Sequence, residues 1–386
     1  MKTRTLLLVL AGGAGGRLEL LTDHRAKPAV PYAGHYRLVD VPLSNALHAG
    51  LEHVWVLEQH NPASLADHLA NGRPWDLDRT VGGLLVLHPH RGAGKEGWHS
   101  GTADALWRQS ALIRDLAADV LVVASADAVY RLDYDALVEE HRGSGAAVTM
   151  VTTRVDPGDA GRYGVVQVED GRVVDYAYKP DEPASDLVAN EVFAFDAARV
   201  LDLLDESAEQ AGVGGLDDLG DAVLPRLVGD GLAREHRLGG YWRDLGTVEA
   251  YWQAHMDLVR DDPPFTPDEP SWPLVTRAGR NGPSRILRGS TVEAALLSPG
   301  SHVAGEVRRS VLSPRVVVES GAVVVDSVLL HDTVVRCGAT VRRSVVDGAE
   351  IGAGVTVGGD GDITLVGIGQ RVTGDVRAGG RVPDAG

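Results

Sequence analysis

A glycine-rich turn directly after an apolar run is the first feature of this chain that could do chemistry. The run covers residues 6–11 and leads into Gly12-Gly13-Ala14-Gly15-Gly16. Glycine lets a backbone approach a ligand closely because it adds no side chain, and its N–H groups can point toward phosphate oxygens. Arg17 and Lys27 place two cations beside this turn. The pattern predicts a strand followed by a phosphate-binding loop.

Two common glycine motifs do not fit this turn. A dinucleotide-binding fingerprint would need glycine where Leu18 stands, and a P-loop would need Ser or Thr after Gly-Lys. The chain has one Gly-Lys pair, Gly94-Lys95, and Glu96 follows it. A flexible turn after a strand remains the alternative on the glycines alone, and Lys27 argues against it.

Lysine is scarce, which draws attention to the lysines that are present. Lys and Arg together number 37, yet lysine stands only at Lys2, Lys27, Lys95 and Lys179. The compact ammonium group of lysine is not interchangeable with a guanidinium at a tight phosphate contact. Lys27 and Lys179 both precede a proline, in Ala-Lys-Pro and Tyr-Lys-Pro. These two lysines are therefore candidate phosphate contacts.

The composition is that of an ordinary soluble protein with a large core. The chain has 386 residues, of which 44% are hydrophobic and 24% charged, and its formal net charge is −17. Such a charge argues against nucleic acid or an anionic membrane as a main partner. The single cysteine, Cys337, excludes an internal disulfide framework and suits a reducing cytoplasm. The N-terminal apolar run is too short for a membrane span, and we expect a cytoplasmic protein.

Strand-like and helix-like segments alternate through the first two thirds of the chain. We expect strands at 5–10, 53–57, 83–87, 119–124 and 147–153, and helices at 61–70, 103–116 and 134–144. This alternation predicts an α/β fold with a Rossmann-like, doubly wound and mostly parallel sheet. Ligands bind such sheets at the carboxyl ends of the strands. The glycine loop and Asp127 both follow strands, so they would open on one crevice.

A period of six residues replaces this pattern near the C-terminus. The aliphatic positions are Val311, Val317, Val323, Leu329, Val335 and Val341, and the spacing resumes at Val345, Ile351 and Val357. Glycine-containing turns fill the gaps. The pattern predicts a hexapeptide-repeat parallel β-helix with these aliphatics in its core, because each coil must stack on its neighbours to bury them. A β-sandwich would instead show turns every 8–12 residues.

These patterns divide the chain into four parts. Residues 1–260 form the predicted catalytic domain, and an Asp/Pro-rich linker covers 261–285. The β-helix is expected at 286–375, with a short tail at 376–386.

The chain resembles the glucose-1-phosphate adenylyltransferase (ADP-glucose pyrophosphorylase) family over about residues 4–360. Besides the first loop, the matching motifs are Tyr36-Arg37-Leu38-Val39-Asp40, Leu43-Ser44-Asn45, Gly101-Thr102-Ala103-Asp104-Ala105, Arg162-Tyr163-Gly164-Val165, Lys179-Pro180, Leu219-Gly220-Asp221 and Tyr241-Trp242-Arg243-Asp244-Leu245-Gly246-Thr247. Their order and spacing together are specific. The resemblance implies a nucleotidyltransferase domain followed by a left-handed parallel β-helix.

The resemblance also implies a reaction: a sugar 1-phosphate attacks the α-phosphorus of ATP and pyrophosphate leaves. The implied catalytic residues are Arg17, Lys27 and Asp127, and the implied Mg²⁺ ligands are Asp127 and Asp244. The nucleotide would contact Gly12, Gly13, Gly15, Gln59, Gly101, Thr102 and Asp104, and the sugar phosphate would contact Gly164, Tyr178, Lys179 and Glu191. The less favoured alternative for Asp127 is a helix cap after its strand, and a structural role is likewise the alternative for Asp244. The two aspartates are 117 residues apart, so their convergence depends on the resemblance.

Several positions depart from the family pattern. Ala14 replaces an arginine and Gly16 a hydroxyl residue in the first loop, and the family's Gly-Asp-His is here Ala126-Asp127-Ala128. Tyr178 replaces a glutamate that contacts glucose in the family. The family's Ser-Met-Gly segment is here Ala189-Asn190-Glu191. A site built to bond a sugar hydroxyl is sensitive to such losses.

Three hypotheses follow. The favoured one is an enzyme that makes ADP-glucose for glycogen or another α-glucan. The second is a nucleotidylyltransferase for another sugar 1-phosphate, and the third is a weakly active or inactive regulatory paralogue. A hexapeptide acyltransferase ranks last, because it would lack the nucleotide-binding domain.

The resemblance implies a homotetramer controlled by metabolites bound near the junction of the two domains. Basic candidates for such an effector site are Arg308, Arg309, Arg342 and Arg343, which could equally be solvated repeat faces. No nucleic-acid or membrane partner is expected.

Overall fold

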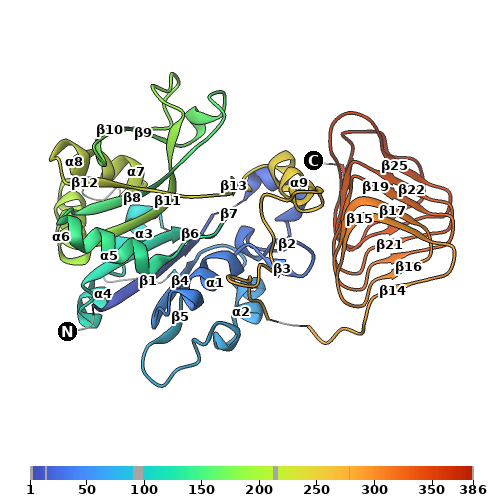
Figure 1. The fold of residues 1–386 in the computed structure, drawn as a ribbon, viewed down its shortest axis with the longest axis horizontal. Coiled ribbons are helices and arrows are strands. Elements are labelled where there is room, and N and C mark those ends of the chain that lie inside the picture. Colours follow the sequence, from blue (N-terminus) through green and yellow to red (C-terminus); the bar gives the residue numbers. More distant parts are fainter. Residues whose placement is uncertain (1–2, 14, 90–98, 212–215, 278, 385–386) are drawn as a thin grey trace.

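The computed structural model describes residues 3–13, 15–89, 99–211, 216–277 and 279–384. Figure 1 shows two parts side by side, a sheet with surrounding helices and a coil of short strands that ends near the C-terminus. The last helix before the coil, α9 (Val248–Leu258), lies between them. In the described part of the chain, no helix is long and apolar enough to cross a membrane.

A nine-stranded sheet forms the frame of the first part, in the order β5-β4-β1-β6-β11-β8-β12-β10-β9. Four neighbouring strands run parallel: β5 (Gly83–Leu87), β4 (His53–Glu58), β1 (Thr5–Ala11) and β6 (Val120–Ser125). The remaining strands are β11 (Leu187–Asp196), β8 (Val148–Arg154), β12 (Ala233–Arg237), β10 (Arg172–Tyr178) and β9 (Gly164–Glu169). Strand β11 is antiparallel to both β6 and β8, so the sheet is parallel in one half and mixed in the other.

All five predicted strands are present, as β1, β4, β5, β6 and β8, and their bounds agree with the predictions to within one residue. Strand β1 shows why its sequence is continuously apolar. Leu7 and Val9 belong to one buried cluster, whereas Leu6 and Leu8 belong to another on the opposite face of the sheet. A parallel strand covered on both faces has no polar side to expose.

The predicted helix at 103–116 is in fact two helices. The first is α3 (Thr102–Trp107) and the second is α4 (Ser110–Leu116). The backbone of Gln109 leaves the helical region, and its N–H bonds to the carbonyl of Leu106 in a tighter turn. The predicted helices at 61–70 and 134–144 are confirmed as α2 (Pro62–Leu69) and α5 (Tyr134–Ser144).

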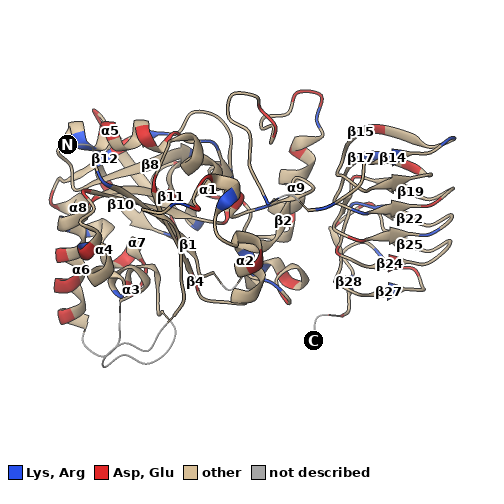
Figure 2. Cartoon of the chain, turned by 90° about the horizontal axis from the view of Figure 1, so that it is seen from below, with Lys and Arg blue, Asp and Glu red and all other residues tan. Residues whose placement is uncertain are grey.

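Further short elements complete this part. The other helices are α1 (Asp40–His48), α6 (Ala197–Ala211), α7 (Leu219–Ala222) and α8 (Leu224–Gly229), with 3₁₀ turns η1 (Gly16–Leu21), η2 (Lys27–Ala29), η3 (Arg73–Trp75) and η4 (Ala160–Arg162). Two small antiparallel pairs join β2 (Pro31–Tyr32) to β3 (Tyr36–Arg37) and β7 (Ala128–Tyr130) to β13 (Trp242–Asp244). Acidic residues, red in Figure 2, are prominent on outward helices such as α6.

The C-terminal part is a coil of stacked parallel strands. In chain order the strands are β14 (Arg285–Ile286), β15 (Thr291–Leu297), β16 (His302–Val303), β17 (Glu306–Leu312), β18 (Val317–Val318), β19 (Val323–Val325), β20 (Val328–Leu329), β21 (Val334–Val335), β22 (Thr340–Arg342), β23 (Ser344–Val346), β24 (Glu350–Ile351), β25 (Thr356–Gly358), β26 (Thr364–Val366), β27 (Arg371–Val372) and β28 (Arg381–Val382). Val317 pairs with Val334, so one full turn takes 17 residues there. This repeat agrees with the predicted β-helix.

The period of six identifies some core residues of the coil correctly and misses others. Leu329, Val335 and Val341 fill its interior as predicted, together with Ile351 and Val357. The prediction was wrong at Val317 and Val323, which are only partly buried, because Val318 and Val324 turn inward instead. Where two valines are adjacent, either side chain could point into the core, and the period alone does not predict which one does.

Val311 and Val345 lie outside the coil's interior because they face the first part of the protein. They stack in register with Val328 and Leu365 along consecutive strands. All four side chains are fully buried in the same apolar cluster as Tyr251 of α9. This ladder therefore joins the coil to the sheet-containing part through a continuous core.

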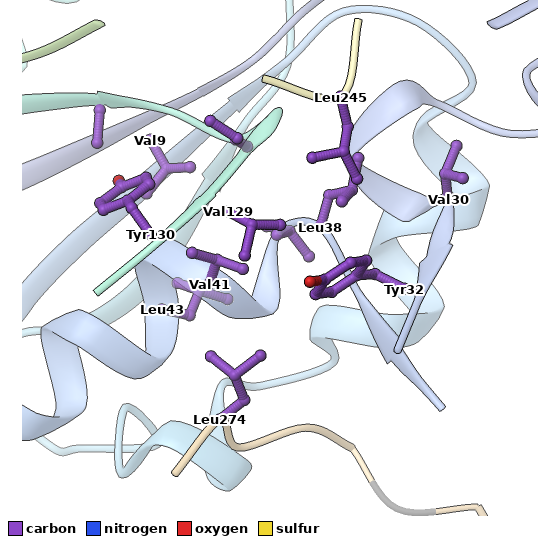
Figure 3. Packing of buried hydrophobic residues seen from close by; sticks show 14 of the residues in the cluster. Val9, Val30, Tyr32, Leu38, Val41, Leu43, Val129, Tyr130, Leu245 and Leu274 are labelled. Atoms are coloured by element: carbon purple, nitrogen blue, oxygen red, sulfur yellow. The ribbon is translucent and has the colours of Figure 1, made fainter. Parts of the chain in front are cut away.

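The predicted linker crosses the surface of the first part as a packed segment. Leu274 packs in the same apolar cluster as Val41 and Leu43 of α1, and Figure 3 shows its side chain beneath them. Trp272 donates its indole N–H to Asn45 at 2.9 Å, and the Val275 N–H bonds to Ser44 Oγ at 2.8 Å. The Leu43-Ser44-Asn45 motif therefore anchors the linker to helix α1.

Candidate active site

A pocket of about 370 Å³ opens at the carboxyl ends of β1 and β6. Its walls include most of the residues implied by the resemblance: Gly12, Gly13, Arg17, Lys27, Gln59, Gly101, Thr102, Asp127, Gly164, Tyr178, Lys179 and Glu191. A smaller adjoining pocket of about 50 Å³ adds Asp244 and shares Arg17, Asp127, Lys179 and Glu191. Residues from distant parts of the sequence thus meet at the edge predicted for ligand binding.

Asp127 and Asp244 converge on Lys27. The Lys27 Nζ lies 2.7 Å from Asp127 Oδ2 and 3.7 Å from Asp244 Oδ1. The small sheet explains the convergence, since Asp244 in β13 pairs with Ala128 in β7. The Leu245 N–H also bonds to the carbonyl of Asp127 at 3.0 Å. Asp127 therefore does not act as the helix cap that its position after a strand allowed, because β7 follows it.

The charges in this group are set by burial and by one another. Burial of Lys27 would lower the pKa of its ammonium group, but the carboxylates of Asp127 and Asp244 outweigh it and raise the pKa. Burial opposes ionisation of Asp127, yet Lys27 and a hydrogen bond from Ser125 lower the pKa of its carboxyl. Burial and the charge of Asp127 raise the pKa of Asp244. Lys27 and Asp127 thus form a partly buried ion pair, with Asp244 as a second acid beside it.

The glycine loop places Arg17 near the same group. A Cβ on Gly246 would lie 2.7 Å from Asp244 Oδ2 and 3.1 Å from Arg17 Nη2, so the three residues are neighbours. Gly15 has a positive φ of 72°, and a Cβ there would stand 2.7 Å from Thr22 Cγ2 and 3.2 Å from the Cβ of Lys27. Gly15, predicted to bind the nucleotide, is therefore packed beneath the Lys27 side chain.

Glu191 adds a further carboxylate to the pocket. Its φ is 62°, and it lies where the pairing of β11 with β8 is interrupted between Ala189 and Phe193. Enclosure in the pocket and the charges of Asp127 and Asp244 raise the pKa of Glu191 to about 7. A left-handed backbone strains a residue with a side chain, so this conformation holds the carboxylate in place at some cost.

Two residues predicted to contact the nucleotide, Gln59 and Thr102, form hydrogen bonds that connect loops of the pocket wall. Gln59 exchanges two hydrogen bonds with the backbone of His99, at 3.2 and 3.3 Å. Thr102 donates from its N–H and hydroxyl to Asp218 Oδ1, at 3.0 and 3.1 Å. A Cβ on Gly101 would stand 2.4 Å from the backbone of Asp217, so only glycine fits there.

Asp104 differs from its predicted role as a pocket residue. Its side chain is fully buried, accepts from the Ser100 N–H at 3.1 Å and pairs with Arg108 at 2.9 Å. It therefore supports the loop that carries Gly101 from below.

The predicted sugar-phosphate side is built around two tyrosines. The Lys179 Nζ donates to the Tyr178 hydroxyl at 2.7 Å, and that hydroxyl donates to Asp218 Oδ2 at 3.0 Å. A Cβ on Gly220 would stand 2.4 Å from the Tyr178 ring, and one on Gly164 would stand 2.6 Å from the Tyr176 hydroxyl. The two glycines make room for the two rings.

Sequence reasoning missed Asp218 and Tyr176, both of which line the pocket. Asp218 directly precedes the Leu219-Gly220-Asp221 motif, which was the available signal. Ala14 and Lys95, which the sequence also singled out, lie outside the described residues.

Comparison with known proteins agrees with this architecture. Residues 6–261 match the nucleotidyl transferase family model, and residues 283–364 match a GlmU-like C-terminal hexapeptide model. A glucose-1-phosphate adenylyltransferase of Thermomicrobium roseum is 42% identical over 395 residues, which cover 97% of this chain and 92% of the relative. The chain belongs to the glucose-1-phosphate adenylyltransferase family.

Two further members of the glucose-1-phosphate adenylyltransferase family match nearly as much of the chain. The protein of Acetivibrio thermocellus is 32% identical, with 97% of this chain and 86% of the relative covered. That of Clostridioides difficile is 33% identical, with 86% and 87% covered. Among the departures from the family pattern, Tyr178, Ala189 and Glu191 face the pocket.

The acidic cluster of this family member can be tested as a metal site. Among the described residues, no group of three or more His, Cys, Asp or Glu side chains is arranged to hold a metal ion. Mg²⁺ in phosphate-transfer sites is usually held by one or two carboxylates together with substrate phosphates. Asp127 and Asp244, set beside the phosphate-loop cations, provide such a pair. Burial and then the charge of Asp127 raise the pKa of Asp244, and a cation would offset that negative charge.

Proposed function

We propose that this protein transfers the adenylyl group of ATP to α-D-glucose 1-phosphate, giving ADP-glucose and pyrophosphate for α-glucan synthesis. The observation that carries the proposal is the convergence of Asp127 and Asp244 on Lys27 in a pocket shared by Arg17 and Lys179. Relatives that match nearly the whole chain are named for this activity.

The reaction is a displacement at phosphorus. A phosphate oxygen of glucose 1-phosphate bonds to the α-phosphorus of ATP, and the bond from that phosphorus to the β-phosphate bridging oxygen breaks. Such chemistry needs positioning and charge neutralisation more than proton transfer. Lys27 is held as a cation by its carboxylate partners, so it is suited to stabilise charge that develops on the phosphates. Arg17 would act beside it.

Asp127 and Asp244 would hold the divalent cation, which we propose to be Mg²⁺. When bound, the ion supplies neutralisation of phosphate charge. Asp127 is suited to the role because the pKa of its carboxyl is lowered, so it is ionised at neutral pH.

Lys179 would bind the phosphate of the sugar substrate, with Gly164, Tyr178 and Glu191 around the sugar itself. The hydrogen-bonded chain from Lys179 through Tyr178 to Asp218 gives this side a fixed shape. Gly12, Gly13, Gln59, Gly101 and Thr102 would surround the nucleotide. Gly15 and Asp104 would support this wall from behind.

A second candidate is a nucleotidylyltransferase for another sugar 1-phosphate. Tyr178, Ala189 and Glu191 favour it, because all three face the pocket on the sugar side and depart from the family pattern. A bulky ring and a carboxylate there would select among sugar hydroxyls differently from the family's glutamate and glycine.

Further properties belong to the same proposal. The parallel order β5-β4-β1-β6 supports a Rossmann-like description of the catalytic domain, and the hexapeptide repeats support a left-handed coil. Limits of 1–260, 261–285, 286–375 and 376–386 for the four parts stay predictions. A homotetramer, metabolite effectors and a cytoplasmic location also stay predictions. Of the basic candidates for an effector site, Arg309 pairs with Asp326 at 2.6 and 2.7 Å.

The test is pyrophosphate release by the purified protein with Mg²⁺, crossing ATP, GTP, UTP and dTTP with a panel of sugar 1-phosphates. Asp127→Asn serves as the inactive variant, and Asp202→Asn, an exposed aspartate on α6, as its matched control. Turnover confined to ATP with glucose 1-phosphate, and lost in Asp127→Asn alone, supports the proposal. Turnover with another sugar supports the second candidate, and no turnover with any pair leaves the regulatory paralogue.

A further inference from the structure

The segment that carries Arg17 and Lys27 lies between the pocket and the coil. A Cβ on Gly15 would stand 2.7 Å from Thr22 Cγ2 and 3.2 Å from the Cβ of Lys27, so the three residues are close neighbours. The Thr22 hydroxyl bonds to the carbonyls of Gly15 and Glu19 at 3.0 and 3.1 Å. These contacts connect the residues of the segment 15–27 to one another, so a displacement of one residue is expected to shift its neighbours. Two of its side chains, Glu19 and Arg25, extend away to the coil.

Arg381 of the last strand, β28, holds Glu19 with two parallel hydrogen bonds from its guanidinium group. The same guanidinium donates to coil carbonyls of Ile363, at 2.7 Å, and Gly379, at 3.1 Å. Glu19 itself has a φ of 51° and interrupts η1, two residues after Arg17. Two hydrogen bonds between a guanidinium group and a carboxylate fix the orientation of the carboxylate as well as its distance. Arg381, itself bonded to carbonyls of the coil, therefore holds the strained Glu19 in place.

Asp347 holds the other end of the segment. Its Oδ2 lies 2.9 Å from Arg25 Nη2, with only 4% of the Asp347 side chain and 13% of the Arg25 side chain exposed. The Asp347 N–H is tied to the carbonyl of Val366 in the next turn of the coil, at 2.8 Å. Arg25 stands two residues before Lys27. A buried ion pair therefore joins the coil to the backbone that presents Lys27.

Asp244 is connected to the coil as well. It lies just before α9, whose Trp252 donates its indole N–H to the carbonyl of Asp326 at 2.8 Å. The guanidinium carbon of Arg343 lies 4.3 Å from the centre of that indole ring. By contrast β9 and β10, which lead to the proposed sugar side, lie at the far end of the sheet from the coil in Figure 1.

We propose that Arg381 and Asp347 are positioning residues of the active site, through which the coil sets the places of Arg17 and Lys27 on its triphosphate side. The inference rests on the proposed roles of those two cations. On this proposal the coil contributes to nucleotide binding by positioning Arg17 and Lys27. The sugar side, anchored elsewhere in the sheet, is independent of it.

Loss of either contact has a specific expected effect. Without Arg381, Glu19 is free to relax from its left-handed conformation, and the turn that carries Arg17 shifts with it. A small displacement of a group that contacts a reacting phosphate slows catalysis strongly. We expect Arg381→Gln to raise the KM for ATP about 10-fold and to lower kcat, with the KM for glucose 1-phosphate changed less than about twofold.

The experiment uses the full-length protein and measures both KM values, kcat and the melting temperature. The variants are Arg381→Gln, Glu19→Gln, their double mutant and Asp347→Asn. Arg336→Gln is the matched control, because Arg336 pairs with Glu319 and Glu350 on the coil itself. Since Glu19 and Arg381 act through each other, the double mutant should be no worse than the more affected single variant. Arg381→Lys should restore part of the loss.

The outcomes separate the two proposals. ATP binding is also measured by calorimetry, so the variants can be compared even if the wild type releases no pyrophosphate, which would overturn the proposed function alone. Weaker ATP binding in Arg381→Gln and Asp347→Asn, with unchanged affinity in Arg336→Gln, supports the positioning role. Equal rises in both KM values, additive effects of Glu19→Gln and Arg381→Gln, or behaviour like that of Arg336→Gln would overturn it.

Discussion

Lys27 Nζ lies 2.7 Å from Asp127 Oδ2, although the two residues are 100 positions apart in the sequence. Lys27 follows the glycine loop after β1, and Asp127 follows β6, the neighbouring parallel strand. The pairing of these two strands therefore brings the ammonium group and the carboxylate together. The ion pair also keeps Lys27 charged in a buried place, which is the state that a phosphate-binding group requires.

Substitution of the two pocket lysines, Lys27 and Lys179, should affect different kinetic constants. Lys27→Gln should lower kcat about 100- to 1,000-fold, because it removes a charge that stabilises the transition state. Lys27→Arg should recover little, since a planar guanidinium does not reproduce the compact ammonium contact that Lys27 makes with Asp127. Lys179→Gln should mainly raise the KM for the sugar phosphate. Steady-state kinetics with each substrate varied in turn would measure the split, and matching profiles for the two glutamine variants would contradict the assignment.

Glu191 should make stability depend on pH. The pKa of its carboxyl is about 7 in the folded protein against an ordinary value of 4.5. Between these values the folded state keeps a proton that the unfolded chain releases, so the free energy of unfolding falls as pH rises and the loss is complete above pH 7. Because the side chain faces the solvent-filled pocket, we expect the loss to be no more than about 1 kcal/mol.

Glu191→Gln should therefore melt at a higher temperature than the wild type at pH 8 and at nearly the same temperature at pH 5. Scanning calorimetry at the two pH values measures the difference. Glu182→Gln, at an exposed glutamate, is the control and should change neither value. An equal rise at both pH values would show that removal of charge is not the cause.

Gly220→Ala should disturb the sugar side more than the nucleotide side, which it can reach only through the Asp218 partner of Tyr178. Its Cβ would stand 2.4 Å from the Tyr178 ring, so the ring and the Lys179 partner on its hydroxyl must move. We expect the KM for glucose 1-phosphate to rise about 10-fold, equivalent to about 1.4 kcal/mol, and the KM for ATP to change less. Gly143→Ala is the matched control, because a Cβ there meets nothing within 4 Å. Unaltered kinetics in Gly220→Ala would argue against a role for Tyr178 at the sugar.

Val345→Ala should destabilise the joint between the coil and the first part. The side chain is fully buried in the ladder that packs on the larger core, so its truncation leaves a cavity and should cost about 2 kcal/mol. Thermal melting compared with that of Val174→Ala, whose valine is 45% exposed, would measure this cost. Equal melting temperatures for the two variants would mean that the ladder adds no stability.

Much of the fold was predictable because its signals are local. The continuous apolar run of β1 predicts a buried strand, and the glycines after it predict a tight turn. The coil was predictable from its period, but its interior was not fully so, since Val317 and Val318 are equally apolar and the period alone does not decide which of them turns inward. The break at Gln109 also escaped prediction, because it depends on one tightened turn.

The site was predictable in its residue types more than in its arrangement. Motif spacing pointed to Lys27, Asp127 and Asp244, but the approach of Asp244 to the other two depends on the pairing of β7 with β13, which no local pattern encodes. The supporting roles of Gly15 and Asp104 are likewise tertiary. Each looks like a ligand contact in the sequence and lies behind the pocket wall in the structure.

The most direct test of the account is a double-mutant cycle on Asp127 and Asp244. Pyrophosphate release would be measured at saturating ATP, glucose 1-phosphate and Mg²⁺ for Asp127→Asn, Asp244→Asn and the double variant, with Asp202→Asn as the control. If the two aspartates form one centre with Lys27, each single variant should lose about 100-fold or more in kcat, and the double variant should be little worse than the more affected single variant. Full activity in either single variant, or losses that multiply in the double variant, would contradict the claim.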